Sequence, residues 1–215
     1  MDRIDLGRVA DRLKIARRIF AYPDEPHRRR HGPTGYTTYE SYREWLRDDY
    51  SYRCVFSLVR EQWFSRKSNF EIDHLEPQSS RPDLACDYEN LLYLTRQMNQ
   101  VRNKRPLPDP CKIALGKCLA VDPKTGEIRA LNPIGNKILN VLKLDNPDAT
   151  AFRLMWLRIF QCVAQTDEAQ FRQLIGYPKD LRDLSKSKPD GNSRPNGIAE
   201  SAFSRLRAGT LPDWH

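Results

Sequence analysis

Residues 70–104 constrain the fold more tightly than any other part of the chain. They read FEIDHLEPQSSRPDLACDYENLLYLTRQMNQVRNK. Apolar and polar residues alternate over 70–75, which predicts a short strand that runs into a loop at Pro77. Residues 88–95 contain leucines able to bury and predict a second extended piece. Residues 95–104 are polar and basic without Gly or Pro, which favours one short helix. The expected order is therefore strand, loop, strand and helix.

Four side chains in this stretch have the chemistry that phosphodiester hydrolysis needs: Asp73, His74, Asn90 and Asn99. A neutral histidine is suited to take a proton near pH 7. Carboxylate and amide oxygens are hard ligands that suit Mg²⁺ or Mn²⁺. On a regular strand the side chains of Asp73 and His74 point to opposite faces. The backbone must therefore bend or end beside them if both act at one site.

The phrases IDHLEPQSS, YENLLYLT and RQMNQVRNK resemble the HNH (ββα-metal) endonucleases, including the nine-residue spacing from Asn90 to Asn99. The resemblance implies that His74 is the general base and that Asp73 and Asn99 hold Mg²⁺ or Mn²⁺. It also implies that Asn90 fixes the loop that carries His74. The implied fold is α+β, a small ββα-metal core with flanking N- and C-terminal helices. Bacterial HNH proteins of this size often serve in mobile elements or in antiviral defence.

The chain departs from many HNH proteins in its cysteines. Those proteins carry two CxxC pairs that bind a structural zinc ion. Here the corresponding positions read Cys54-Val55-Phe56-Ser57 and Thr95-Arg96-Gln97-Met98, so one cysteine of four remains. Four ligands are the rule for a structural zinc site. We therefore expect no structural zinc.

A second asparagine competes with Asn99 for the metal. On a helix that begins near Thr95, residues four apart lie about 40° from one another, because each residue turns about 100°. Asn103 therefore faces nearly the same direction as Asn99 on such a helix. The family spacing favours Asn99, and Asn103 stays as the alternative ligand.

The formal net charge of +8 predicts attraction to a polyanion, and nucleic acid is the first candidate. We expect DNA as the substrate, with RNA not excluded. Arg28, Arg29 and Arg30 lie in a proline-containing loop and are candidate phosphate contacts, although a solvated linker is the alternative. Arg102 and Lys104 are candidates for a neighbouring phosphate.

The five cysteines are odd in number and form no CxxC pair. No apolar run has the length of a signal peptide or a transmembrane helix. These features favour a reduced, cytoplasmic protein that does not contact a membrane.

We expect four segments along the chain: a basic N-terminal helix and loop (1–34), the HNH nuclease core (35–110), a hairpin and helical part (111–183), and a linker and tail (184–215). In the first two, periodicity predicts an amphipathic helix over 6–20, with Arg8, Arg12, Arg17 and Arg18 on its polar side, and a helix over 39–48. Residues 52–58 are expected to be a strand, and the next piece, with Trp63 and Phe64, should form a hairpin with residues 70–75.

The C-terminal half is expected to be mostly helical. Residues 117–131 predict a hairpin, Asn132 caps a helix, Pro147 starts another, and residues 167–175 form a third. The helix from Pro147 has an apolar stripe assigned to the core: Phe152, Met155, Trp156, Ile159, Phe160 and Val163. Residues 184–197 have the composition of a linker, and a short helix follows over 198–206.

These features together predict a metal-dependent endonuclease. Two alternatives stay open. One is a module that grips nucleic acid without cutting it. The other is a nuclease subunit that is active only with a larger partner protein, such as an ATPase.

Overall fold

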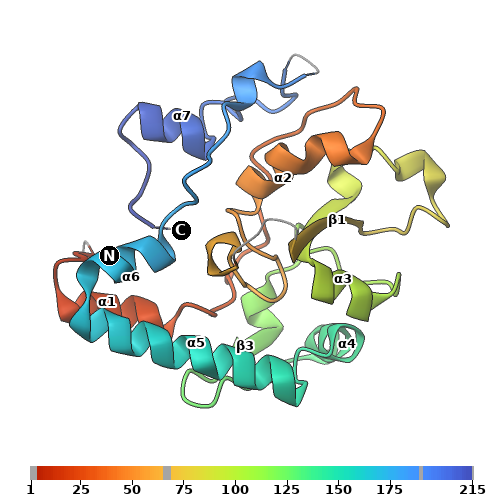
Figure 1. Ribbon diagram of the computed structural model, residues 1–215. Coiled ribbons are helices and arrows are strands. Elements are labelled where there is room, and N and C mark those ends of the chain that lie inside the picture. Colours follow the sequence, from red (N-terminus) through yellow and green to blue (C-terminus); the bar gives the residue numbers. More distant parts are fainter. Residues whose placement is uncertain (1–3, 65–68, 189–190, 215) are drawn as a thin grey trace.

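The computed structural model describes residues 4–64, 69–188 and 191–214 and shows a mixed α+β fold with two small antiparallel sheets (Figure 1). The helices are α1 (Val9–Arg17), α2 (Arg43–Asp49), α3 (Arg96–Arg102), α4 (Pro133–Leu142), α5 (Pro147–Thr166), α6 (Glu168–Ile175) and α7 (Ala202–Arg207). The strands are β1 (Phe70–His74), β2 (Leu91–Thr95), β3 (Leu119–Val121) and β4 (Ile128–Ala130). Short 3-10 turns lie at Tyr39–Tyr42, Glu61–Trp63, Pro82–Leu84, Tyr88–Asn90, Leu115–Lys117 and Leu184–Lys186.

The first sheet pairs β1 with β2 in antiparallel register, from Phe70 opposite Thr95 to His74 opposite Leu91. Helix α3 follows β2 without a linker, because the Thr95 hydroxyl caps it by accepting from the Met98 amide at 3.3 Å. The chain therefore reverses after β2 and α3 runs back beside β1. The expected order of strand, loop, strand and helix over residues 70–104 is confirmed.

The strand expected over residues 52–58 is wrong. Tyr52 and Leu58 have φ angles of 56° and 60°, which belong to the left-handed region and cannot continue a β ladder. One isolated bridge joins Arg53 and Arg60, and the segment otherwise consists of turns. The partner of β1 is therefore β2 rather than the chain before it.

Helix α1 is shorter than expected and packs on the long helix α5 (Figure 1). Arg12, which periodicity placed on its polar side, is 5 % exposed. Its guanidinium donates to the carbonyls of Ala164 at 2.8 Å and Leu6 at 2.7 Å. These bonds replace the water that the charge gives up, so Arg12 joins α1 to α5 instead of facing solvent.

The buried stripe of α5 is also rotated from its expected position. Its buried residues are Arg153, Leu157, Phe160 and Ala164, whereas Met155 is 46 % exposed. The Arg153 guanidinium is satisfied by backbone carbonyls, at 2.7 Å from Gly126 and 2.6 Å from Leu144. Sequence periodicity assigns an arginine to the solvent-facing side of a helix. The buried Arg153 therefore rotates the observed stripe away from the expected one. Of the other members of the expected stripe, Phe160 is buried in the core, and Phe152, Trp156 and Val163 pack partly buried against it.

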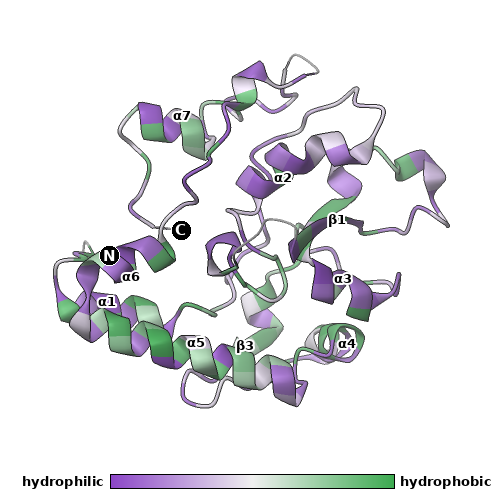
Figure 2. Cartoon of the chain, viewed as in Figure 1, coloured by the Kyte–Doolittle hydropathy of each residue, from purple (hydrophilic) through white to green (hydrophobic). Residues whose placement is uncertain are grey.

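The second sheet and the helix starts after it follow the sequence closely. β3 and β4 form the expected hairpin. The Asn132 side chain accepts from the Gly135 amide at 2.9 Å and caps α4, and Asn146 caps α5 with Pro147 in its first turn. Figure 2 shows α4 as largely hydrophobic and α3 above it as mostly hydrophilic. The two helices contact each other.

The segment expected to be a free linker is docked where the structure describes it. His31 and Asp48 are buried and joined at 2.9 Å between Nε2 and Oδ1. The Asn192 amide donates to the other ring nitrogen of His31 at 3.1 Å. The Ala202 amide donates to Asp48 Oδ2 at 2.8 Å. These bonds tie residues 191–202 to the arginine-rich loop and to α2.

His27 is held neutral inside the same region. Its ring stacks on Tyr50 with centroids 4.4 Å apart, and its Nε2 is buried without a hydrogen-bond partner among the described residues. Burial, with a smaller effect of the nearby charges of Arg29, Arg53 and Arg30, lowers the pKa of His27 to about 3. The unfolded chain therefore binds a proton at mildly acidic pH that the folded chain does not.

This difference predicts an acid-sensitive fold. The affected pH window runs from the ordinary histidine pKa of 6.5 down to the folded value of about 3. Within it, His27 should lower the free energy of unfolding by up to about 1.4 kcal/mol for each unit by which the pH falls. His27→Phe keeps the aromatic stack but cannot titrate. Urea unfolding at pH 7, 6 and 5 should show a shallower loss of stability for the variant, and equal slopes would contradict the prediction.

Candidate functional site

The site is built on the end of β1, where Asp73 is tied to α3. Its carboxylate forms an ion pair with the guanidinium of Arg102, and its Oδ1 accepts from the His74 amide at 2.8 Å. The Arg102 side chain is fully buried. It also donates to the carbonyls of His74 at 2.7 Å, Leu75 at 2.6 Å and Arg105 at 2.9 Å. One side chain thus fixes the end of β1, the start of the following loop and the end of α3.

This placement corrects the expected role of Arg102. A side chain whose donors are spent on Asp73 and on backbone carbonyls cannot reach out to a phosphate. Lys104, in contrast, is exposed just beyond α3 and stays a candidate contact.

His74 is held in one tautomer. Its Nε2 lies 3.0 Å from the carbonyl oxygen of Ala85, and an oxygen of this kind can only accept. Nε2 therefore carries the proton and Nδ1 carries the free lone pair. The described residues give Nδ1 no hydrogen-bond partner, and it is not among the buried unpaired atoms. Tyr39 packs against the ring edge to face, with centroids 4.8 Å apart, and limits its rotation.

Asn90 closes the loop that begins after His74. Its Oδ1 accepts from the Glu76 amide at 2.8 Å, and its Nδ2 donates to the Glu76 carbonyl at 3.0 Å and to the Leu84 carbonyl at 3.3 Å. The Leu75 amide donates to the Asn90 carbonyl at 2.7 Å. The asparagine thus fixes both ends of the loop, which is the contact that the HNH resemblance implies for it. It bonds backbone rather than a reacting group, so its place is structural.

Asn99 and Asn103 are in different surroundings. Asn99 lies within α3 and its Nδ2 donates to Glu71 Oε2 at 2.9 Å. Asn103 lies past the last helical residue, exposed, with a φ of 45°. Helix α3 ends at Arg102, one residue before Asn103. The helical rotation that would turn Asn103 to the same side as Asn99 therefore does not extend to it. Asn99 is therefore the asparagine that faces β1.

The contacts between β1 and α3 follow the same order along both elements. Glu71 meets Asn99, and two residues later Asp73 meets Arg102. Residues two apart on a strand share a face, and residues three apart on a helix do as well. One face of β1 thus presents two carboxylates to one face of α3.

The donor set suits a hard divalent cation. Asp73 offers carboxylate oxygens. Asn99 donates to Glu71 through Nδ2, so its Oδ1 stays available as an acceptor. Within the described residues, no group of three or more His, Cys, Asp or Glu side chains is placed to hold a metal ion. A Mg²⁺ ion held by the oxygens of Asp73 and Asn99 would take its remaining ligands from water and phosphate, as is usual for this ion.

The arginine-rich loop contributes less surface than its sequence indicates. Arg29 is buried between Tyr50 and Tyr88 and donates to the Leu91 carbonyl at 2.5 Å. This corrects its expected role as a phosphate contact, because its charge is enclosed by protein. Arg28 is exposed and lies 3.8 Å from a carboxylate oxygen of Glu200.

Arg30 is partly buried and pairs with Asp48 and Asp49. Its charge is thus largely compensated within the protein. Of the three loop arginines, Arg28 is the one whose side chain is open to an approaching phosphate.

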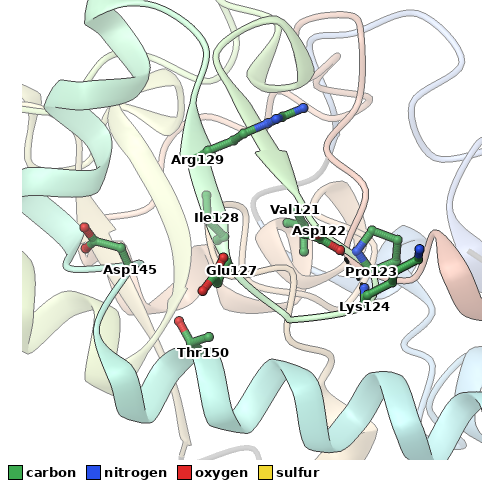
Figure 3. Close-up of a pocket in the computed structure, with 9 residues that line it drawn as sticks. All are labelled: Val121, Asp122, Pro123, Lys124, Glu127, Ile128, Arg129, Asp145 and Thr150. Carbon is green, nitrogen blue, oxygen red and sulfur yellow. Dashed lines mark hydrogen bonds between the residues drawn. The ribbon is translucent and has the colours of Figure 1, made fainter.

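A cavity of about 650 Å³ lies elsewhere, on the β3–β4 hairpin and the start of α5 (Figure 3). Its charged side chains are of both signs and include Asp122, Lys124, Glu127 and Arg129. None of the side chains at the end of β1 lines it. The cavity adds no group to the chemistry of the candidate site.

Three groups at the site escape the sequence pattern. Glu71 shares a strand face with Asp73 by simple alternation, which is a signal that could have found it. Tyr39 begins a 3-10 turn far away in the chain, and the Ala85 carbonyl lies in the loop that follows His74; no local pattern places either beside the ring.

Comparison with known proteins adds no relative. No protein-family model matches the chain, and a search of curated proteins finds no match. Within the described residues, no helix is both long and apolar enough to cross a lipid bilayer. The functional reading therefore depends on the site itself.

The buried position of Arg102 predicts a large loss of stability on its removal. Arg102→Met leaves the carboxylate of Asp73 and three backbone carbonyls without their donor, which should cost about 3–5 kcal/mol of unfolding free energy. Arg96→Met is the matched control, because Arg96 pairs with Glu71 at a half-exposed position and should cost less than about 1 kcal/mol. Chemical denaturation measures both, and equal losses would contradict the assignment.

Proposed function

We propose that the chain is a metal-dependent endonuclease of the HNH type that hydrolyses phosphodiester bonds, most favourably in DNA. The observation that carries the proposal is the state of His74. Its Nε2 proton is committed to the Ala85 carbonyl, so Nδ1 is a free base at the end of β1. A positioned neutral imidazole is the group that water activation requires near pH 7.

In the proposed reaction His74 Nδ1 accepts a proton from a water molecule as its oxygen attacks phosphorus. The bond from phosphorus to the 3′ oxygen breaks, and the leaving oxygen takes a proton from solvent. The carbonyl of Ala85 stabilises the imidazolium that forms, because it accepts from the positively charged ring. Tyr39 keeps the ring plane fixed during the transfer.

Asp73 and Asn99 would hold the metal ion, which supplies positive charge to the phosphate oxygens when it is bound. Arg102 has a supporting part. It holds Asp73 through its guanidinium and fixes the backbone of His74 at the same time. The base and the ligand are thereby kept at one constant separation, a form of preorganisation that catalysis rewards.

The substrate class follows from charge. The net charge of +8 favours a polyanion. Arg28 and Lys104 supply exposed cations on the chain, one in the arginine-rich loop and one beyond α3. Both are suited to backbone phosphates, which position a nucleic acid without reading its sequence.

The first test of this proposal removes the base. His74→Ala should lower the rate of plasmid cleavage with Mg²⁺ or Mn²⁺ by about 10²–10⁴-fold, the usual contribution of general-base catalysis. Binding of the same DNA should stay nearly unchanged, because the ring is not a phosphate contact. His27→Phe is the control, since it removes a histidine outside the site and should cleave as the wild type does.

Other outcomes of that experiment separate the alternatives. Equal cleavage by wild type and His74→Ala would remove His74 from the mechanism. Binding without cleavage by the wild type would favour a module that grips nucleic acid only, and cleavage that appears on adding a partner protein would favour a regulated subunit.

The second test separates the two asparagines. Asn99→Ala should abolish or strongly reduce metal-dependent cleavage and raise the Mg²⁺ concentration it requires, because the amide oxygen beside Asp73 is lost. Asn103→Gly should change the rate by less than about tenfold, since Asn103 lies outside α3 and glycine tolerates its positive φ. A Mg²⁺ titration of both variants decides, and the reverse result would move the ligand to Asn103.

A further inference from the structure

Glu71 receives two hydrogen bonds from α3. Its Oε1 accepts from Arg96 Nε at 2.7 Å, and its Oε2 accepts from Asn99 Nδ2 at 2.9 Å. The Glu71 side chain is 30 % exposed and that of Arg96 is 54 % exposed. A pair this open contributes little to stability. The main effect of Glu71 is therefore on the orientation of the Asn99 side chain.

The contact with Glu71 decides which way the Asn99 amide points. A side-chain amide carries an oxygen on one side and an NH₂ group on the other, and half a turn exchanges them. An ionised carboxylate can only accept, so the NH₂ group must face Glu71. The oxygen of Asn99 is therefore directed away from Glu71. Without the carboxylate, both orientations become available, and one of them offers a metal ion the wrong atom.

We propose that Glu71 is a positioning residue that orients the Asn99 amide for metal binding, an inference that depends on the proposed metal site. Arg96 has a part in this arrangement, because it engages the second oxygen of Glu71 and stops the carboxylate from turning. Groups that orient metal ligands in this way commonly change metal affinity by about 10–100-fold when they are removed.

The experiment measures Mn²⁺ affinity of the full chain without nucleic acid, by electron paramagnetic resonance of the free ion. Glu71→Ala should bind Mn²⁺ about 10–100-fold more weakly than the wild type. Glu71→Gln should weaken binding as well, because its amide can turn and present its NH₂ group to Asn99, so it no longer fixes which way that amide points. In an Asn99→Asp background, where the side chain carries an oxygen on both sides, Glu71→Ala should not weaken Mn²⁺ binding further. Glu127→Ala removes an exposed carboxylate outside the site and controls for the loss of one negative charge.

The Asn99→Asp background makes the role falsifiable. If Glu71→Ala weakens Mn²⁺ binding there as much as in the wild type, the carboxylate itself holds the metal or its charge attracts it, and the positioning role is wrong. Unchanged affinity of the single variant Glu71→Ala would also overturn it. Thermal unfolding checks the fold of each variant, and a loss of fold in Glu71→Ala would overturn the inference as well, because the contact would then be structural.

The same measurements keep this inference apart from the proposed function. A wild-type chain that binds Mn²⁺ but cuts no DNA would contradict the nuclease and leave the Glu71 comparison valid. A wild-type chain that binds no Mn²⁺ would overturn both.

Discussion

A fully buried guanidinium is the constraint on which the site depends. Arg102 meets the carboxylate of Asp73 and the carbonyls on either side of the strand end. A charge in this position is tolerable only while all of its donors are used. β1 and α3 are consequently locked in one register, and a slip by a single residue would leave an unpaired charge inside the protein.

The loop after His74 is held from its other end by Asn90. Between Arg102 and Asn90, the backbone that carries His74 is fixed on both sides, and the Ala85 carbonyl from the same loop sets the ring tautomer. The loop therefore acts as a rigid frame although it contains little regular structure. Its rigidity comes from hydrogen bonds between side chains and backbone groups rather than from a hydrophobic core.

The sequence predicted the elements whose signals are local. The alternation over residues 70–75 predicted β1, and the cap at Asn132 and the proline at 147 placed the starts of α4 and α5 correctly. The candidate residues Asp73, Asn90 and Asn99 lie close to β1 and α3. Strand alternation and the turn of a helix are short-range rules, so the sequence could predict this grouping. The family assignment itself and the activity stay predictions.

The errors share one physical cause: the deciding partner is far away in the chain. Arg12, Arg29 and Arg102 read as surface cations, yet each is buried against backbone carbonyls. Residues 52–58 are the exception, because they have strand composition and are turned by left-handed residues at their own ends. Residues 184–197 have linker composition, and Asn192 nevertheless bonds a buried histidine.

The docking of the C-terminal segment on Asp48 has a consequence for how the chain acquires its structure. Asp48 and its partner Ala202 are 154 residues apart. During synthesis the carboxylate emerges long before the amide that completes its bonding, so the early part of the chain must wait with that group still hydrated. Contacts of such separation slow folding, because a long loop must close before they form. The last bonds made around α2 should therefore form after the β1–α3 contacts, whose residues lie within 35 positions of one another in the sequence.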